Sequence, residues 1–190
     1  RFFAPYSRFK ALERMIERPL EIKGVSIVPL KTTARFQFRL NWSKGYVSSA
    51  ALAATLAQVR TIPEGNLILV TCHHPLVEAG TSTTSRTRKG VEALEALSAA
   101  GAHAVLTGHV HDPFDVPRDI NGRIVRLIGA GTLSERVRAH PPSFNEIHIH
   151  GDMLKTVVRV MGEGAHPAPA IAPSALQDDL FLKIDDKPQS

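Results

Sequence analysis

Two short histidine phrases contain the residues whose type and spacing best suit chemistry. The first phrase is His73-His74-Pro75, and the second is Gly108-His109-Val110-His111. Neutral imidazole is a good ligand for Zn, Mn, Fe or Ni. In extended backbone, residues i and i+2 point the same way, roughly 6.5–7 Å apart. Since two catalytic ions lie about 3.5–4 Å apart, His109 and His111 can each serve one ion of a pair. The pattern therefore predicts a metal centre containing His73, His109 and His111.

Each phrase follows an apolar run that predicts a buried strand. The two runs are Leu67–Cys72 and His103–Thr107, and an Ala/Leu/Glu-rich helix is expected between them at about Val91–Ala100. A right-handed crossover makes the two strands of such a unit parallel. Open α/β sheets bind ligands at the carboxyl ends of their strands. We therefore expect the histidines to converge at one edge of the sheet.

These and neighbouring residues also suit other roles. One histidine after a strand is usually a surface or hydrogen-bonded core residue, whereas three at equivalent strand ends favour a metal. Cys72 beside His73 suggests a thiol nucleophile and its base, but adjacent strand residues point to opposite faces, which favours a buried structural cysteine. His148 and His150 alternate with isoleucine, a pattern typical of an exposed strand face, with a second metal site as the alternative.

The remaining elements predict an α/β domain followed by a tail. We expect a helix over 7–17, extended structure over 21–31, a helix from Ser48 or Ser49 through Val59, and strands at Ile124–Ile128, Asn145–His150 and Leu154–Val160. From Gly162 onward the Pro, Ala and Gly content predicts a linker or mobile extension. The predicted organisation is a domain over 1–161 and a Pro/Ala-rich tail over 162–190.

Composition narrows the classes of protein. The chain has 190 residues, of which 43% are hydrophobic and 22% charged, so wholesale disorder is excluded. No apolar run approaches the ~20 residues of a membrane span, so no membrane association is expected. The single cysteine and the lack of a basic-then-apolar leader predict a cytoplasmic protein.

Charge is concentrated near the start of the sequence. Residues 1–40 hold nine Lys and Arg against three Glu, a net +6, while the remainder holds 14 basic against 15 acidic residues, a net −1. A basic stretch raises the prospect of nucleic-acid binding, but these charges are scattered and no binding motif accompanies them. Nucleic acid is therefore a disfavoured partner.

Taken together, the two histidine phrases resemble the last two signature blocks of the calcineurin-like metallophosphoesterases. The resemblance covers about Arg1–Met161, including the NWSKG phrase and the turn Ala130–Thr132. It implies that the chain forms part of a β-sandwich flanked by helices, in a four-layer αββα arrangement. It also implies two divalent or trivalent metal ions (Mn, Fe or Zn) and hydrolysis of a phosphate monoester or diester by a metal-bound hydroxide.

The resemblance also implies roles for individual residues. His73 and His109 would bind one metal, His111 the other, and His74 would orient a ligand or meet the substrate. Separately, Arg86 and Arg88 lie in a polar loop after His74, where cations can clamp phosphoryl oxygens. The competing interpretation of that loop is a solvated connection to the next helix, and it is slightly favoured. Asp112 and Asp115 suit either a place behind the metal ligands or turns around a proline.

The sequence departs from the family pattern in its first part. Members also need Asp-x-His, Gly-Asp and Gly-Asn-His blocks upstream, and nothing in residues 1–72 matches any of them. We therefore expect the chain to carry the C-terminal half of such a site, and to be weakly active or inactive alone. The other half would precede it in cis or belong to another chain, and a homo-oligomer is a further possibility. The alternative is a non-catalytic α/β module or inactive fragment that binds a partner or nucleic acid through its basic N-terminal stretch.

Overall fold

The structure is a computed structural model that describes residues 20–33, 44–81, 87–134, 141–151, 153–162 and 165–167. The helix expected over 7–17 lies outside these residues, as does the tail beyond 167. The described elements are the helices α2 (Ser49–Val59) and α3 (Gly90–Ala99) and the strands β1 (Val25–Pro29), β2 (Leu67–Cys72), β3 (Ala104–Thr107), β4 (Phe114–Ile120), β5 (Arg123–Gly129), β6 (Ser143–His150), β7 (Met153–Val160) and β8 (Ala165–Pro167). Every strand and helix predicted within the described ranges is present, with ends shifted by a few residues at most.

A five-stranded mixed sheet forms the centre of the molecule. Its order is β1-β2-β3-β5-β4, and all neighbours are parallel except the edge strand β4, which is antiparallel to β5. The predicted strand–helix–strand unit is confirmed, since β2 and β3 are adjacent and parallel and α3 connects them. The predicted helix cap is also confirmed, because the Ser48 hydroxyl accepts a hydrogen bond from the Ala51 amide at 3.1 Å.

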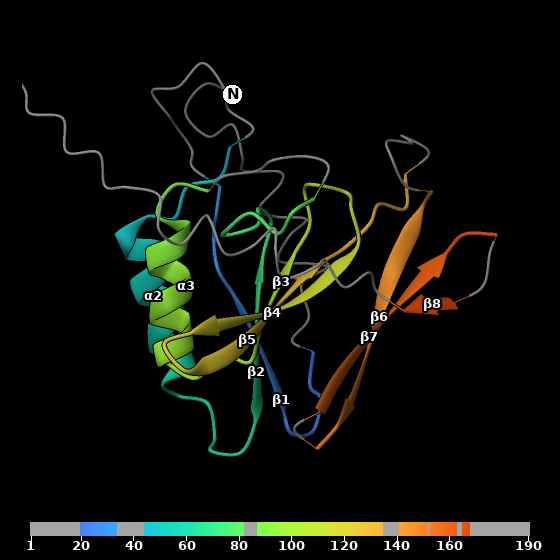
Figure 1. Ribbon diagram of the computed structural model, residues 1–190. Coiled ribbons are helices and arrows are strands. Elements are labelled where there is room, and N and C mark those ends of the chain that lie inside the picture. The colour runs from blue at the N-terminus through green and yellow to red at the C-terminus, as the bar shows by residue number, and fades with distance from the viewer. Residues whose placement is uncertain are drawn as a thin grey trace, which may run out of the picture.

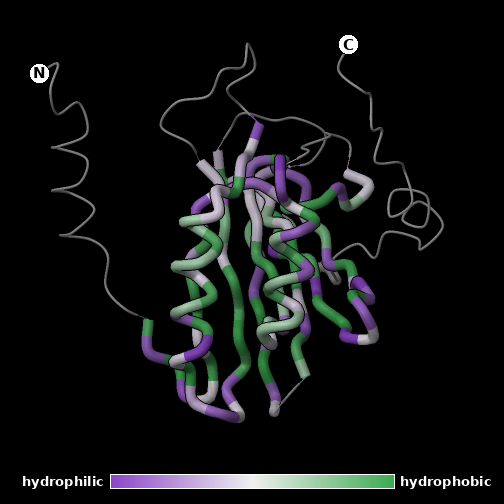
Figure 2. The backbone as a smooth tube through the Cα atoms, turned by 90° about the vertical axis from the view of Figure 1, so that its left-hand side faces the viewer, coloured by the Kyte–Doolittle hydropathy of each residue, from purple (hydrophilic) through white to green (hydrophobic). Residues whose placement is uncertain are grey.

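Helices cover one face of this sheet and a second sheet covers the other (Figure 1). On the helix side, Val70 and Val105 of the strands pack with Leu94 and Leu97 of α3. On the opposite side, residues of the large sheet pack against Leu154 of β7 in the antiparallel sheet β6-β7-β8. Figure 2 shows α2 and α3 side by side over strands that are coloured mostly hydrophobic. Burial on both faces explains why β2 and β3 read as continuous apolar runs. The α/β class is thus confirmed, and the described residues form an α, a β and a second β layer.

Strand β4 was not predicted, because Asp112 and Asp115, which flank Pro113, also suited a turn. Pro117 is compatible with β4 because this strand lies at the edge of the sheet. Asn121 and Gly122 join β4 to β5 with φ values of 54° and 82°. Such a two-residue Asn-Gly loop with positive φ at both positions is a strong hairpin signal in a sequence. The Asn121-Gly122 dipeptide is therefore the sequence signal that could have predicted the hairpin of β4 and β5.

An ion pair next to this hairpin connects the two sheets. Asp115 lies within β4, where it pairs with Arg126 of β5, and Nε of Arg126 is 2.9 Å from Oδ1 of Asp115. The same guanidinium donates to the backbone carbonyl of Leu154 in β7. The interpretation of Asp115 as a turn residue was therefore wrong, and its hydrogen-bonding partner is an arginine rather than a metal-binding histidine.

The described part of the predicted tail begins with an ordered segment. Strand β8 pairs with β7 in antiparallel register, so the second sheet extends beyond residue 162. The division at 162 stays a prediction for the residues after 167. Among the described residues, no helix has the length and apolar character required to cross a membrane.

Candidate metal centre

The register of β2 and β3 brings the two histidine phrases together. Cys72 at the end of β2 lies opposite Thr107 at the end of β3. The next residues are therefore also neighbours, and the amide of Gly108 donates to the His73 carbonyl at 3.1 Å. The predicted convergence at the carboxyl ends of these strands is confirmed for His73 and His109.

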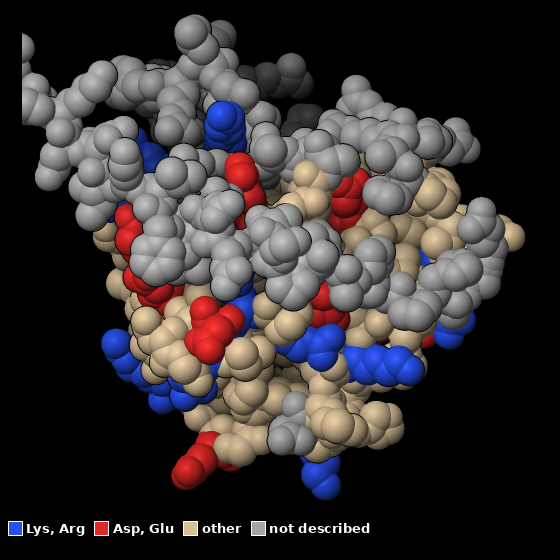
Figure 3. All heavy atoms as spheres, viewed as in Figure 1, with Lys and Arg blue, Asp and Glu red and all other residues tan. Residues whose placement is uncertain are grey.

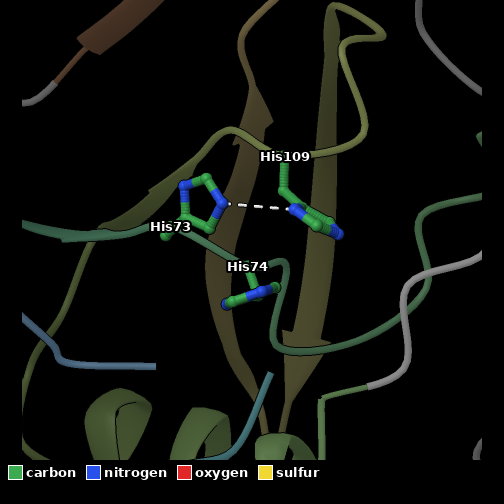
Figure 4. Close-up of side chains that lie close together, drawn as sticks. All are labelled: His73, His74 and His109. Atoms are coloured by element: carbon green, nitrogen blue, oxygen red, sulfur yellow. Dashed lines mark hydrogen bonds between the residues drawn. The ribbon is translucent and has the colours of Figure 1, made fainter. Parts of the chain in front are cut away.

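Three imidazole rings form a compact cluster at this edge (Figure 4). The ring centroids are 4.6 Å apart for His73 and His74, 5.0 Å for His73 and His109, and 4.4 Å for His74 and His109. Each ring offers one nitrogen such that the three nitrogens lie within 4.8 Å of one another. Nδ1 of His109 and Nε2 of His73 lie 3.2 Å apart. The rings form a potential three-ligand site.

The backbone at His109 has an unusual conformation. His109 has a φ of 68°, and the Val110 amide donates to the Gly108 carbonyl at 2.8 Å, which closes a three-residue turn around it. His111 also has a positive φ, 63°. The expectation of extended backbone through this phrase was therefore wrong. A positive φ at a non-glycine residue is strained, and such strain clusters at functional sites.

His74 is held more firmly than its two partners. His74 is only 5% exposed. Nδ1 of its ring is 3.1 Å from Oγ1 of Thr32. The same hydroxyl oxygen accepts a hydrogen bond from the backbone amide of His74 at 3.1 Å. A Cβ on Gly45 would lie 2.7 Å from Cβ of His74, so only glycine allows this packing. Gly45 belongs to the NWSKG phrase, and Thr32 follows the neighbouring strand β1.

Thr32 is the residue of this site that sequence analysis missed. The only signal was a hydroxyl just after a predicted strand, which is too common to single out. Metal-binding histidines usually donate their second ring N–H to an oxygen, which fixes the ring and its tautomer. If Nδ1 of His74 carries the proton and donates to Thr32, Nε2 is left with a lone pair for an ion.

His111 lies outside the three-ring cluster, although it was expected to be a ligand. Its Nδ1 is buried and has no hydrogen-bond partner among the described residues. Buried polar atoms normally have a hydrogen-bonding partner or bind an ion, so Nδ1 of His111 is suited to contact an ion or another segment of protein. The assignment of His111 to a second metal therefore stays a prediction.

The spacing of the cluster fits a zinc-type ion. With Zn–N bonds of about 2.0–2.1 Å and tetrahedral angles, ligand nitrogens are about 3.3 Å apart. The distance of 3.2 Å between His73 and His109 is close to this edge length. Among the described residues no carboxylate belongs to the cluster, so it lacks the bridging Asp of a two-metal centre. The residues present fit one ion with three nitrogen ligands.

The surroundings of the neighbouring cysteine disfavour a thiolate nucleophile. Burial raises the pKa of the Cys72 thiol to about 12, so the thiol stays protonated at neutral pH. Its Sγ donates to the His74 carbonyl at 3.3 Å. These contacts agree with the interpretation of Cys72 as a structural residue.

Three histidines elsewhere in the described chain have structural explanations. Nδ1 of His103 accepts a hydrogen bond from the Ile68 amide at 3.0 Å, and burial, with the nearby charge of Arg123, lowers the His103 pKa. His148 and His150 are exposed on β6, and Nε2 of His148 lies 3.3 Å from a Glu146 oxygen. The exposed-face interpretation of these two residues fits their positions.

The predicted substrate arginines lie in or beside a loop that is only partly described. Arg86 falls outside the described residues. Arg88 is exposed, and its guanidinium carbon is 5.7 Å from the centre of the Tyr46 ring. Substrate binding by either residue stays a prediction. Asp112 is 4% exposed and lies one residue after His111, which keeps it a candidate for a supporting role.

Comparisons with known proteins give only distant likenesses. No family model matches the sequence, and no curated protein is significantly similar to it. Among solved structures, the chain is similar to GAP50, the anchor in the inner membrane complex of Plasmodium, with 17% identity and a TM-score of 0.39 over 70% of this chain and 52% of that one. The chain thus spans about half the length of that structure. It is also similar to Vps29 of Entamoeba histolytica, both a single-substitution variant (10% identity, TM-score 0.29) and a zinc complex (10%, 0.30), each over 74% of this chain and 95% of that one. At these values the likeness assigns no activity to this chain.

Proposed function

We propose that the chain carries part of the active site of a metal-dependent phosphoesterase. The observation that supports this most is the convergence of His73, His74 and His109 at the ends of β2 and β3, with one nitrogen from each ring within 4.8 Å of the others. Three imidazoles so arranged leave a fourth position of a tetrahedral ion for water or substrate, as in catalytic zinc sites.

Each residue has a defined task in this proposal. His73 and His109 bind the ion from adjacent strands, while His74 completes the set with its ring oriented by Thr32. When bound, such an ion supplies Lewis acidity toward a phosphoryl oxygen and a water of lowered pKa. The left-handed backbone at His109 aims its ring at His73 before any ion arrives, which reduces the ordering that binding requires.

A two-metal version of this site requires ligands beyond the cluster. His111 is assigned to the second ion, Mn, Fe or Zn, and the carboxylates have to come from a further segment or another chain, because none of the described residues supplies one to the cluster. Arg86 and Arg88 are assigned to the phosphoryl oxygens of a phosphate monoester or diester. The chain alone is therefore expected to bind metal but to turn over little substrate.

Metal binding is the direct test. The wild-type chain should remove Zn²⁺ from a chromogenic chelator with a stoichiometry of about one ion per chain, given a three-ligand site. His73→Ala and His109→Ala should each weaken this binding by at least about 10-fold, since loss of even a supporting contact costs that much. His150→Ala, which removes an exposed histidine of β6, is the matched control and should bind zinc like wild type. Zinc binding that is unchanged in both test variants would refute the site.

Activity tests the idea of a half-site separately. A chromogenic phosphodiester with added Mn²⁺ or Zn²⁺ should be hydrolysed only slowly by the chain alone. Robust hydrolysis that is abolished by His109→Ala would show that this chain is active without the other half of the predicted active site.

Nothing in the described residues favours the alternative function of partner or nucleic-acid binding through residues 1–40. Of the nine basic residues in that stretch, the structure describes Lys23 and Lys31. Figure 3 shows Lys and Arg mixed with Asp and Glu over the described part of one face. Steeply salt-dependent binding to nucleic acid without a metal requirement would support the alternative.

A further inference from the structure

A histidine side chain joins the amino ends of β2 and β3. Nδ1 of His103 accepts a hydrogen bond from the Ile68 amide at 3.0 Å. In the other direction, the His103 amide donates to the Ile68 carbonyl at 2.9 Å. His103 directly precedes β3, and Ile68 is the second residue of β2. One residue therefore satisfies both backbone groups of Ile68.

The imidazole takes the position of a backbone carbonyl in the sheet. The Leu67 amide donates to the Gly24 carbonyl on the β1 side, so by alternation the Ile68 amide points toward β3. Backbone pairing of β2 with β3 begins only at Leu69, one residue farther along. Ile68 is 9% exposed, and a buried amide needs an acceptor. The ring of His103 supplies this acceptor.

Protonation of the ring abolishes the acceptor. In a neutral imidazole one nitrogen carries the proton and the other accepts, whereas an imidazolium carries a proton on both nitrogens. The hydrogen bond from Ile68 therefore requires a neutral His103 with its proton on Nε2. Once Nδ1 is protonated, two N–H donors face each other across 3.0 Å, so the contact breaks. His103 is half-buried, so protons from water reach the ring.

The surroundings of His103 oppose its protonation. Burial lowers the pKa of His103 from its ordinary value, and the nearby charge of Arg123 in β5 lowers this pKa further. The neighbouring elements also carry Arg126, which pairs with Asp115, and the exposed Glu64, Glu92 and Glu95. None of these five residues is among the groups that shift the pKa of His103. An imidazolium at this position therefore gains no counter-charge from the described residues.

We infer that His103 is a pH-sensitive clasp between β2 and β3, whose ring holds the Ile68 amide while it is neutral and releases the amide when it is protonated. The release opens the amino edge of the five-stranded sheet, at the opposite ends of β2 and β3 from the histidine cluster. The clasp contains no residue of that cluster, so the inference does not rest on the proposed function.

The clasp stabilises the fold at neutral pH and is lost in acid. The ordinary histidine pKa of 6.5 applies to the unfolded chain, and the pKa of the folded chain is lower, so the unfolded chain takes up the proton first as pH falls. The contribution of the clasp to stability is therefore complete above pH 6.5 and disappears as pH falls through the pKa of folded His103.

Amide hydrogen exchange followed by NMR tests the clasp in the chelator-treated wild-type chain. Between about pH 7.5 and about pH 5, the protection factor of the Ile68 amide should fall about 2- to 10-fold, the change that loss of one hydrogen bond produces. The Val70 amide also points toward β3 but lies where the two strands are paired by their backbones, so its protection factor should change less than about 2-fold. An unchanged Ile68 amide, or an equal fall at Val70, would overturn the inference.

Two substitutions separate the acceptor from the charge. His103→Asn places Oδ1 in the position of Nδ1 and does not titrate, so Ile68 protection should be the same at both pH values. His103→Ala removes the acceptor, so Ile68 protection should be low at both. His150→Asn, which replaces an exposed histidine of β6, is the matched control and should keep the wild-type pH dependence. A fall in His103→Asn as large as in wild type, or its disappearance in His150→Asn, would show that another group is responsible and refute the clasp.

The ring itself provides a test that needs no variant. In proton–nitrogen correlation spectra of the wild-type chain at about pH 7.5, the neutral ring of His103 should carry its proton on Nε2. The midpoint of its titration should lie below 6.5. A neutral ring with its proton on Nδ1, or a midpoint at or above 6.5, would contradict the clasp even if both His103 variants fail to fold.

Discussion

The strained backbone at His109 leads to a prediction that compares two substitutions of this residue, with and without metal. His109→Gly should make the metal-free chain more stable than His109→Ala, because the φ of 68° suits glycine and not alanine. Both variants lose the imidazole, so the comparison isolates the backbone.

The expected difference is about 1 kcal/mol in the free energy of unfolding. A left-handed conformation costs a non-glycine residue roughly 1–2 kcal/mol. The greater freedom of glycine in the unfolded chain takes back about 0.4–1 kcal/mol. For a chain of this size, about 1 kcal/mol corresponds to a rise in melting temperature of roughly 2–4 °C.

Zinc should stabilise the wild-type chain far more than either variant. At a free zinc concentration about 100-fold above the dissociation constant, binding adds about 2.7 kcal/mol to the stability of the wild-type chain. Both variants lack a ligand and should gain much less, which leaves wild type the most stable of the three. Urea unfolding followed by circular dichroism, in chelator and in zinc, measures both effects.

An exposed strand position provides the control. His148 lies in β6 and its φ is not positive. There His148→Gly should be less stable than His148→Ala by roughly 0.5–1 kcal/mol. If His109→Gly is no more stable than His109→Ala in chelator, the backbone at His109 is not strained. Equal stabilisation of all three chains by zinc would contradict the metal assignment.

Three further predictions concern contacts around the site and core. Thr32→Val should weaken zinc binding by about 10- to 100-fold, measured by chelator competition, because it removes the hydroxyl that orients His74. The free energy of unfolding should fall as pH rises from about 9 toward 12. The reason is that the pKa of the Cys72 thiol is 9.0 in the unfolded chain but about 12 in the folded chain. In urea titrations, Cys72→Ala should reduce this fall in the free energy of unfolding. Arg126→Met should lower the free energy of unfolding by roughly 3 kcal/mol, because it leaves Asp115, whose side chain is 6% exposed, without its counter-charge.

Matched variants complete these three tests. Thr61→Val removes an exposed hydroxyl from the end of α2 and should leave zinc binding unchanged, so an equal loss in both threonine variants would contradict the role of Thr32. A pH dependence of stability that is identical in wild type and Cys72→Ala would show that the thiol is not the group responsible. For the ion pair, Asp115→Asn combined with Arg126→Met should recover part of the lost stability, and no recovery would refute the counter-charge explanation.

The sequence alone determined where the histidines would meet. The apolar runs of β2 and β3 and the helix between them are local patterns, and their parallel arrangement follows from a general rule of chirality. The convergence of His73 and His109 was therefore predictable. Two errors came from local interpretation. Asp115, which follows Pro113, was interpreted as a possible turn residue although it lies in β4, and the backbone around His109 was assumed to be extended.

Only the tertiary structure decided which side chains complete the site. Thr32 reaches His74 because β1 pairs with β2 in parallel register, and Gly45 provides the space in which that ring packs. Local patterns depend on neighbours in sequence, whereas these contacts join residues of different strands whose register and packing are properties of the whole chain.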